Sequence, residues 1–361
     1  MKILIIHATA GNGHKKAAEA VYNGIKDHTN YDVRCVDALD YTNSFYRTLY
    51  RKSYKILISY FSWVWAFFFW LTDIPFLLAI IRGSRKMLYI QNAGKLHRFL
   101  REENPDCIIA THFFPHEVAC YLKRKNLISS KLICVVTDYD VHSMWFSKGI
   151  DHYTVASEYT KDKLISLRIP EGQISVTGIP TDEKFSKIYD RDQLKEKLGL
   201  KKDIFTTLIA TGSFGIGNIE EIIDNLKGVQ SIVICGSNES LFKRLSAKKM
   251  DLVKVCGFVD NMHEYMAVSD AMITKPGGLS ISEALVRGLP LVFFSAIPGQ
   301  ETNNIRVLKG YGIGVSDVSA QEMAQEIQKL SSSEEYRLAN QEKIKKIARP
   351  SAVSDIIKLI P

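Results

Sequence analysis

The segment from Ala271 to Asn304 constrains the fold of this chain more than any other. An apolar strand (271–274) leads through a glycine turn (275–278) into a helix, and a second apolar strand (289–294) follows. Two buried strands joined by a helix form a parallel unit, because the chain must cross back over the sheet between them. The turn then lies at the carboxyl end of the first strand, where backbone N–H groups and the positive end of the helix dipole converge. The segment therefore predicts a parallel sheet with an anion-binding turn at its edge.

Polar residues near this turn add contacts suited to a sugar. Glu283 lies one turn into the helix, in a position to accept hydrogen bonds from sugar hydroxyls. The loop 298–301 returns to the same edge of the sheet with the amide of Gln300 and the carboxylate of Glu301. An anion site and sugar contacts at one edge of a parallel sheet predict a site for a nucleotide sugar.

The rest of the chain repeats this alternation of strands and helices in two series. Its 361 residues are enough for two domains of ordinary size. We therefore expect an α/β fold of two doubly wound, Rossmann-like domains, 1–180 and 181–361, that face each other across a cleft. The last helix is a candidate to pack back on the first domain. The expected strands are 2–9, 33–39, 107–111, 132–137, 153–156, 207–210, 231–235, 253–258, 271–274 and 289–294.

The positive charge of the chain is concentrated in residues 45–100. The formal net charge is +8, and this region holds nine basic residues against one acid, Asp73, so it accounts for the whole excess. A basic excess confined to one region indicates a local function, such as attraction to an anionic surface. The nine are Arg47, Arg51, Lys52, Lys55, Arg82, Arg85, Lys86, Lys95 and Arg98.

An aromatic segment lies inside this basic region. Eight of the eleven residues 60–70 are aromatic, and the apolar run 56–71 is shorter than the ~20 residues needed to span a bilayer. Aromatic residues flanked by basic ones are typical of a helix in the headgroup layer, so we expect a membrane-docking insertion over 45–90. A buried core helix and a transmembrane hairpin through 76–81 are the alternatives. The predicted membrane contacts are Arg51, Lys52, Lys55, Tyr60, Phe61, Trp63, Trp65, Phe68, Trp70, Arg82, Arg85 and Lys86.

Other features of the sequence exclude several classes of protein. The six cysteines form no C-x-x-C pair, which indicates neither a zinc ribbon nor a disulfide framework and fits a reducing compartment. The first apolar run, 3–6, is too short for a signal peptide. The continuous apolar runs of the basic region are unlike a solvated nucleic-acid groove, so we expect no nucleic-acid partner.

Two glycine loops follow strands that begin the two series. The first, 10–14, lacks the spacing of a dinucleotide fingerprint and the lysine of a P-loop, but it puts His14 at the start of a helix. A histidine there can act as general base for an acceptor hydroxyl, or it can simply cap its helix. The second loop, 212–217, is either a plain connection or, through Gly215 and its neighbours, a set of amides for a diphosphate.

Seven short motifs occur in order along the chain and together resemble one known family. That family comprises the monogalactosyldiacylglycerol synthases and the processive diacylglycerol β-glycosyltransferases, relatives of the peptidoglycan lipid-intermediate N-acetylglucosaminyltransferase. The resemblance covers nearly the whole chain and implies a GT-B fold, in which the second domain holds a UDP-sugar and the first holds the lipid acceptor. The motifs are 11–14, 136–139 with His142 and Trp145, 178–180, 233–238, 257–259, 275–278 and 298–301.

The resemblance also implies roles for individual residues. His14 is the expected base, and the aromatic, basic segment matches the family's membrane-docking insertion in position. The expected UDP-sugar contacts are Phe258 and Val259 for uracil, Glu283 for ribose, Lys275, Gly277, Gly278, Leu279 and Ser280 for the diphosphate, Gln300 and Glu301 for the hexose, with Gly13, Gly215 and Asn304 nearby.

Asp138 and Asp140 have the spacing of the D-x-D metal motif of the other major glycosyltransferase architecture. Two tandem α/β domains argue against that architecture, so we expect no metal and no cofactor. Asp138 should instead face the cleft as a second catalytic residue, where it could orient His14 or contact the acceptor. His112 and His116 are four residues apart, and the segment 116–120 begins His-Glu but lacks the second histidine of a zincin. These two histidines are therefore not expected to bind metal.

The expected activity is a metal-independent, inverting transfer of glucose or galactose from a UDP-hexose to diacylglycerol. The expected location is the cytoplasmic face of the cell membrane, as a peripheral or monotopic protein on an anionic lipid surface. A transferase acting on a polyprenyl-linked or other lipid, a soluble UDP-sugar 2-epimerase and a non-catalytic nucleotide-sugar sensor are the alternatives. Vesicle binding would separate the epimerase from the others, because an epimerase has no need of the aromatic segment.

Overall fold

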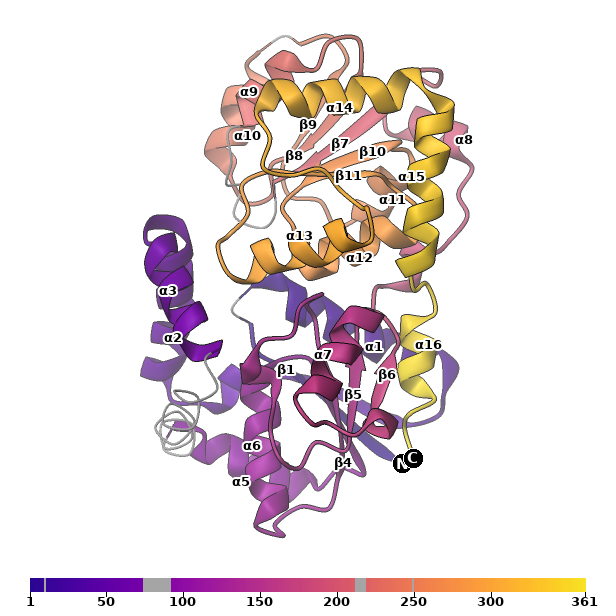
Figure 1. The fold of residues 1–361 in the computed structure, drawn as a ribbon. Helices are drawn as coiled ribbons and strands as arrows, with labels where there is room; N and C mark the ends of the chain where they lie inside the picture. Colours follow the sequence, from indigo (N-terminus) through magenta and orange to yellow (C-terminus); the bar gives the residue numbers. More distant parts are fainter. Residues whose placement is uncertain (10, 74–91, 212–218, 249) are drawn as a thin grey trace. The chain divides into compact units, whose positions relative to one another are not determined.

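A computed structural model describes residues 1–9, 11–73, 92–211, 219–248 and 250–361 (Figure 1). At 51, 54, 55, 57–60 and 62 it describes the backbone alone. The chain forms two compact units, each with its own sheet. Unit 1 consists of Met1–Asp182, Ile297–Asn304 and Pro350–Pro361, and unit 2 of Glu183–Ala296 and Ile305–Arg349.

Unit 1 is built on a six-stranded sheet in the order β2-β1-β3-β4-β5-β6, in which every pairing is parallel. The chain leaves β1 for β2 on one side and later returns to β3 on the other side, so the order reverses between β1 and β3. Such a switch point, at the carboxyl ends of the strands, is where ligands bind in doubly wound sheets. The strands are β1 (Lys2–His7), β2 (Asp32–Asp37), β3 (Cys107–Ala110), β4 (Lys131–Val135), β5 (His152–Val155) and β6 (Ile174–Val176).

The core of unit 1 has one layer on each face of this sheet. Ile3, Ile5 and Ile109 point to the face that helices α1 and α16 cover, whereas Leu4, Ile6 and Ile108 point to the other face. This alternation of side chains along each strand explains why the strands are apolar throughout. The helices are α1 (Asn12–His28), α2 (Ser44–Tyr60), α3 (Ser62–Asp73), α5 (Gly94–Glu103), α6 (Phe113–Arg124), α7 (Glu158–Ser166) and α16 (Ala352–Ile357), with a 3-10 turn η2 at Ser143–Trp145.

Unit 2 is built on a five-stranded parallel sheet in the order β11-β10-β7-β8-β9. Its order reverses between β7 and β10, so the turn after β10 lies at the switch point of this sheet. The strands are β7 (Thr206–Ala210), β8 (Gln230–Ile234), β9 (Val253–Cys256), β10 (Ala271–Thr274) and β11 (Leu291–Phe293). The helices are α8 (Arg191–Lys197), α9 (Ile219–Asn225), α10 (Glu239–Ser246), α11 (Met262–Ala267), α12 (Gly278–Val286), α14 (Ala320–Ser332) and α15 (Glu334–Ile347).

Helix α13 (Gln300–Gly310) belongs to both units. Its first residues, up to Asn304, are part of unit 1, and the residues from Ile305 onward are part of unit 2. The C-terminal helix α16 belongs to unit 1 and packs beside α1 (Figure 1).

The expectation of two parallel α/β sheets is confirmed. Each of the ten strands expected from the sequence overlaps an observed strand, and the bounds differ by at most two residues at either end. The sequence did not reveal β6, because its three residues, Ile174–Val176, are too few to give a recognisable alternation.

The aromatic segment forms two helices rather than one. Helix α2 ends at Tyr60 and α3 begins at Ser62, so Phe61 lies at the break between them. Within the described parts of the chain, no helix is both long and apolar enough to cross a membrane.

The packing of α1 against α16 generates a prediction about Gly24. A Cβ atom at Gly24 would overlap Val353 Cγ1. Alanine is favoured over glycine inside a helix by about 1 kcal/mol, but overpacking costs about 1–3 kcal/mol. We expect Gly24→Ala to lower the free energy of unfolding by up to about 2 kcal/mol in urea titrations. Val353→Ala should relieve the overlap, so Gly24→Ala should cost less in that background, and an equal cost in both backgrounds would contradict this packing.

Candidate functional site

His14 lies in the first turn of α1, directly after the carboxyl end of β1. Its Nδ1 lies 2.8 Å from the backbone oxygen of Thr111 and 2.8 Å from the Oγ1 of Thr137. A carbonyl oxygen only accepts, so the Nδ1 of His14 carries the hydrogen. In the neutral ring the Nε2 is then unprotonated and can take a proton from a substrate.

Aromatic rings enclose the His14 imidazole. The His112 ring packs against it edge to face with centroids 4.6 Å apart, and the Trp145 ring lies at 6.1 Å. His112 accepts at Nδ1 from the N–H of Phe114 at 3.0 Å, and its Nε2 lies 3.4 Å from the Oη of Tyr50. His112 therefore caps α6 and presents a neutral ring to His14.

The electrostatics of this site keep His14 uncharged. Burial lowers the pKa of His14 to about 4, although the hydrogen bond to the Thr111 carbonyl acts in the opposite direction. Burial also holds the pKa of His112 well below its usual value. Near neutral pH the His14 ring is consequently in the form that can accept a proton.

Asp138 follows β4 and makes a different set of contacts from those expected. The Nε2 of Gln300 donates to its Oδ1 at 2.7 Å, and the Nδ2 of Asn304 lies 3.5 Å from the same oxygen. Burial raises the pKa of Asp138 to about 6, against the effect of these two hydrogen bonds. His14 is bonded to Thr111 and Thr137 instead, so within the described residues Asp138 does not orient the base.

Asn304 ties the start of α13 to the loop after β4. Its Oδ1 accepts from the backbone N–H groups of Tyr139, at 2.8 Å, and Asp140, at 3.4 Å. Glu301 accepts from the N–H of Ile297 at 2.7 Å, which closes the turn that leads into α13. Gln300, Glu301 and Asn304 thus lie together in unit 1.

Asp140, the second acid of the D-x-D spacing, is paired with a lysine. The Nζ of Lys163 lies 2.7 Å from its Oδ1, and the Asp140 side chain is buried. His116 lies within 3.5 Å of the Sγ of Cys134. Among the residues that the structure describes, no three His, Cys, Asp or Glu side chains gather closely enough to hold a metal ion.

The glycine turn of unit 2 has the geometry of an anion site. Strand β10 ends at Thr274, and α12 begins at Gly278 with Gly277 as its N-cap, where no side chain caps the free N–H groups. The first turn of α12 contains no acidic residue, and the space around a Cβ at Gly277 is open. Leu279 and Ser280 are half-buried in this turn, and Lys275 precedes it.

The remaining predicted donor contacts also lie in unit 2. Glu283 is half-buried in the second turn of α12. Phe258 is 73% exposed and lies with Val259 in the segment that follows β9. Gly215 lies outside the described residues, while Gly13 precedes His14 in α1.

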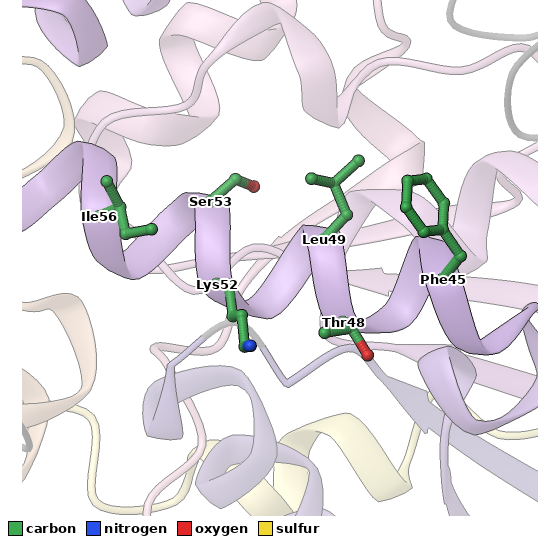
Figure 2. A pocket seen from close by; sticks show the side chains of 6 residues that line it. All are labelled: Phe45, Thr48, Leu49, Lys52, Ser53 and Ile56. Carbon is green, nitrogen blue, oxygen red and sulfur yellow. The ribbon is translucent and has the colours of Figure 1, made fainter.

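Helices α2 and α3 expose a large apolar surface. In α3, Trp63 is 72% and Trp70 is 61% exposed and Phe68 is exposed as well, whereas Trp65 is half-buried; Phe61, at the break before α3, is also exposed. In α2, a shallow hollow of about 420 Å³ is lined by side chains from successive turns of the helix (Figure 2). The hollow is lined by Phe45, Thr48, Leu49, Lys52, Ser53 and Ile56. The side chains of Arg51, Lys55 and Tyr60, and all of Arg82, Arg85 and Lys86, lie outside what the structure describes.

The partners of His14, Thr111 and Thr137, were not predicted from the sequence. Thr111 follows β3 and Thr137 follows β4, and both meet His14 because β3 lies between β1 and β4 in the sheet. The strand order that brings them together is not visible in a single sequence. Polar residues directly after apolar strands were the available signal.

The chain matches two known protein families over most of its length. Residues 14–181 match the monogalactosyldiacylglycerol (MGDG) synthase family, and residues 217–360 match the C-terminal domain of glycosyltransferase family 28. A processive diacylglycerol beta-glucosyltransferase from Bacillus cereus is 30% identical over 372 residues, covering 99% of this chain and 93% of that protein.

Solved structures with low sequence identity share the fold. MurG from Acinetobacter baumannii has a TM-score of 0.62 at 14% identity, over 99% of this chain and 98% of that one. UDP-GlcNAc 2-epimerase from Neisseria meningitidis has a TM-score of 0.59 at 15% identity, over 99% of both chains. The fold is therefore GT-B-like, and the sequence matches make the family resemblance a firm assignment. The chain belongs to the family of the monogalactosyldiacylglycerol synthases and the processive diacylglycerol glycosyltransferases.

Proposed function

We propose that this chain is an inverting glycosyltransferase that moves a hexose from a UDP-hexose to the free hydroxyl of diacylglycerol. The observation that carries the proposal is the state of His14, a neutral imidazole whose Nδ1 hydrogen is engaged by Thr111. The family membership of the chain supports the choice of substrates, and the turn before α12 supports a donor with a diphosphate.

The reaction forms one bond and breaks one. The diacylglycerol oxygen attacks the anomeric carbon of the hexose while its proton passes to the Nε2 of His14. The bond from the anomeric carbon to the β-phosphate oxygen breaks, and UDP departs with the electron pair. Attack opposite to the leaving group converts an α-linked donor into a β-glycosyl diacylglycerol.

The charge on the departing UDP requires stabilisation. The N–H groups at Gly278–Ser280 and the positive end of the α12 dipole suit a diphosphate, and Lys275 adds a cation. We propose that these groups act without a divalent ion. Phe258 and Val259 would contact uracil, and Glu283 the ribose.

The turn that begins α13 supports a site for the hexose. One N–H of the Gln300 amide donates to Asp138, which leaves its second N–H and its oxygen for sugar hydroxyls. Glu301 lies beside it as a further acceptor. Asp138 acts in this scheme by holding Gln300, and either glucose or galactose satisfies these groups.

The exposed faces of α2 and α3 support peripheral attachment to a lipid surface. Exposed Trp and Phe side chains gain free energy when they enter the headgroup layer, and basic residues add attraction to anionic lipid. Diacylglycerol resides in such a surface, so attachment would bring the enzyme to its acceptor.

The proposed mechanism first predicts the effect of removing the base. His14→Ala should lower kcat for hexosyl transfer about 10²–10⁴-fold, because the acceptor proton loses its destination, while UDP affinity stays unchanged. Mass analysis of lipids after incubation with UDP-hexose, diacylglycerol vesicles and EDTA measures this. His28→Ala, at the exposed far end of the same helix, is the matched control and should retain wild-type turnover. Normal turnover by His14→Ala, or loss of transfer in EDTA alone, contradicts the mechanism.

A second prediction separates Asp138 from His14 by pH. The pKa of Asp138 is raised to about 6 and that of His14 is lowered to about 4. We expect kcat/KM to fall as pH drops through about 6, because protonated Asp138 is a weaker acceptor for Gln300. Asp138→Asn keeps an acceptor oxygen but cannot ionise, so the fall in kcat/KM near pH 6 should disappear. Only the fall near pH 4, where His14 becomes protonated, should remain. If kcat/KM of Asp138→Asn still falls near pH 6, a group other than Asp138 causes that fall.

The same variant makes a prediction about stability. A carboxyl whose folded pKa is raised stabilises the fold below its unfolded pKa and loses that contribution as pH rises through its folded pKa. Asp138→Asn should therefore raise Tm near pH 7.5 and leave it nearly unchanged near pH 4. Equal shifts at both pH values would mean that the Asp138 charge is not destabilising.

A further prediction concerns the aromatic helix. Trp63→Ala and Trp70→Ala should each lower affinity for anionic vesicles about tenfold, because an apolar side chain gains about 1.5–3 kcal/mol on leaving water. Co-sedimentation with vesicles measures this. Ile188→Ala removes an apolar side chain of unit 2 that is 99% exposed and should not change sedimentation. Equal effects from all three would indicate non-specific adhesion.

A further inference from the structure

The last turn of α3 is hydrogen-bonded to the 3-10 turn η2. The backbone N–H of Ser143 donates to the Oδ1 of Asp73 at 3.0 Å, and the Oγ of Ser143 donates to the backbone oxygen of Thr72 at 2.7 Å. His142 and Ser143 are both buried. The end of the aromatic helix is thus attached to a loop of the sheet, and not only to the helix beside it.

His142 makes a third connection between α3 and η2. Its Nδ1 accepts from the N–H of Met144 at 3.1 Å, so its Nε2 carries the hydrogen and donates to the backbone oxygen of Phe69 at 3.0 Å. The rings of His142 and Phe69 lie 4.3 Å apart. The Phe69 ring also fills the space beside Gly299, where an added Cβ would be 2.8 Å from Phe69 Cδ1. Gly299 precedes Gln300 of the proposed hexose site.

The other end of η2 reaches the base. Trp145 is the last residue of this three-residue turn, its N–H donates to the oxygen of His142 at 3.0 Å, and its ring lies 6.1 Å from that of His14. This short turn thus connects the end of α3 to the Trp145 ring that packs near His14.

Helix α3 carries its outward and inward functions on adjacent residues. Phe68 and Trp70 are exposed, whereas Phe69 between them is half-buried against His142 and Gly299. The face that would enter a lipid surface and the face that supports the site therefore belong to one rigid turn of helix.

We propose that Asp73 and Phe69 are positioning residues, which act through η2 and Gly299 to hold Trp145, His14 and Gln300 in the arrangement that transfer requires. Engagement of α3 with the lipid surface then sets the geometry of the site as well as bringing the enzyme to its acceptor. This inference rests on the proposed diacylglycerol transfer.

The test compares two substitutions of Asp73. Asp73→Ala removes the acceptor for the Ser143 N–H, whereas Asp73→Asn keeps an oxygen at that position. With vesicles of diacylglycerol and anionic phospholipid at saturation, we expect Asp73→Ala to lower kcat about tenfold or more. Its vesicle affinity and its UDP affinity should stay within about twofold of wild type, and Asp73→Asn should recover most of the activity.

Two further variants sharpen the result. Phe69→Ala should behave as Asp73→Ala does, while Phe68→Ala, the exposed neighbour, should give the opposite split, with vesicle affinity reduced by a larger factor than kcat. Ser143→Ala removes only the hydrogen bond to Thr72. It replaces Asp73→Ala in the test if thermal melts show that Asp73→Ala is unfolded. The proposal requires a lower kcat in Ser143→Ala also.

Three outcomes would overturn the proposal. Wild-type kcat in folded Asp73→Ala and Ser143→Ala means that the connection does not position the site. A fall in vesicle affinity that accounts for the whole loss of activity means that α3 is an anchor only. Absence of hexosyl transfer by the wild-type protein overturns the proposed function, and this inference with it.

Discussion

The parallel pairing of β1 with β3 and of β3 with β4 is the constraint on which the site of unit 1 depends. Parallel strands end at the same edge, so residues that follow three different strands, His14, Thr111 and Thr137, come within hydrogen-bond distance. The Thr111 carbonyl then selects the tautomer of His14, which decides that the Nε2 is the atom available to a substrate. A single main-chain oxygen thereby specifies which nitrogen of the proposed base can take a proton.

Burial shifts the pKa values of His14 and Asp138 in opposite directions, because desolvation disfavours whichever form is charged. It lowers the pKa of His14 to about 4 and raises that of Asp138 to about 6. A base with so low a pKa is a weak proton acceptor in water. The proposed role of His14 in transfer therefore requires that the acceptor hydroxyl lose its proton while the bond between the hexose and UDP breaks. At that stage the hydroxyl has become far more acidic.

Local sequence predicted much of the fold but not the partners of the site residues. Apolar runs revealed ten of the eleven strands found among the described residues, and the glycine turn before α12 was visible because Lys275–Gly278 directly follows an apolar strand. The bond between Gln300 and Asp138 joins residues 162 positions apart and depends on where α13 begins. No periodicity encodes such a contact. From the sequence, Asp138 was expected either to orient His14 or to contact the acceptor, whereas its observed partners are amides of α13.

The exposed face of α3 and its buried attachment have to be considered together. Large apolar side chains left in water forgo about 1.5–3 kcal/mol each, so the exposed parts of Trp63 and Trp70 add little to the stability of the isolated protein. The opposite side of the same helix is nevertheless held by Ser143 and His142 through hydrogen bonds to Phe69, Thr72 and Asp73. A helix serving only as an anchor needs no fixed angle to the sheet. These bonds specify that angle, and a fixed angle matters when the bound surface must present a hydroxyl to one nitrogen of His14.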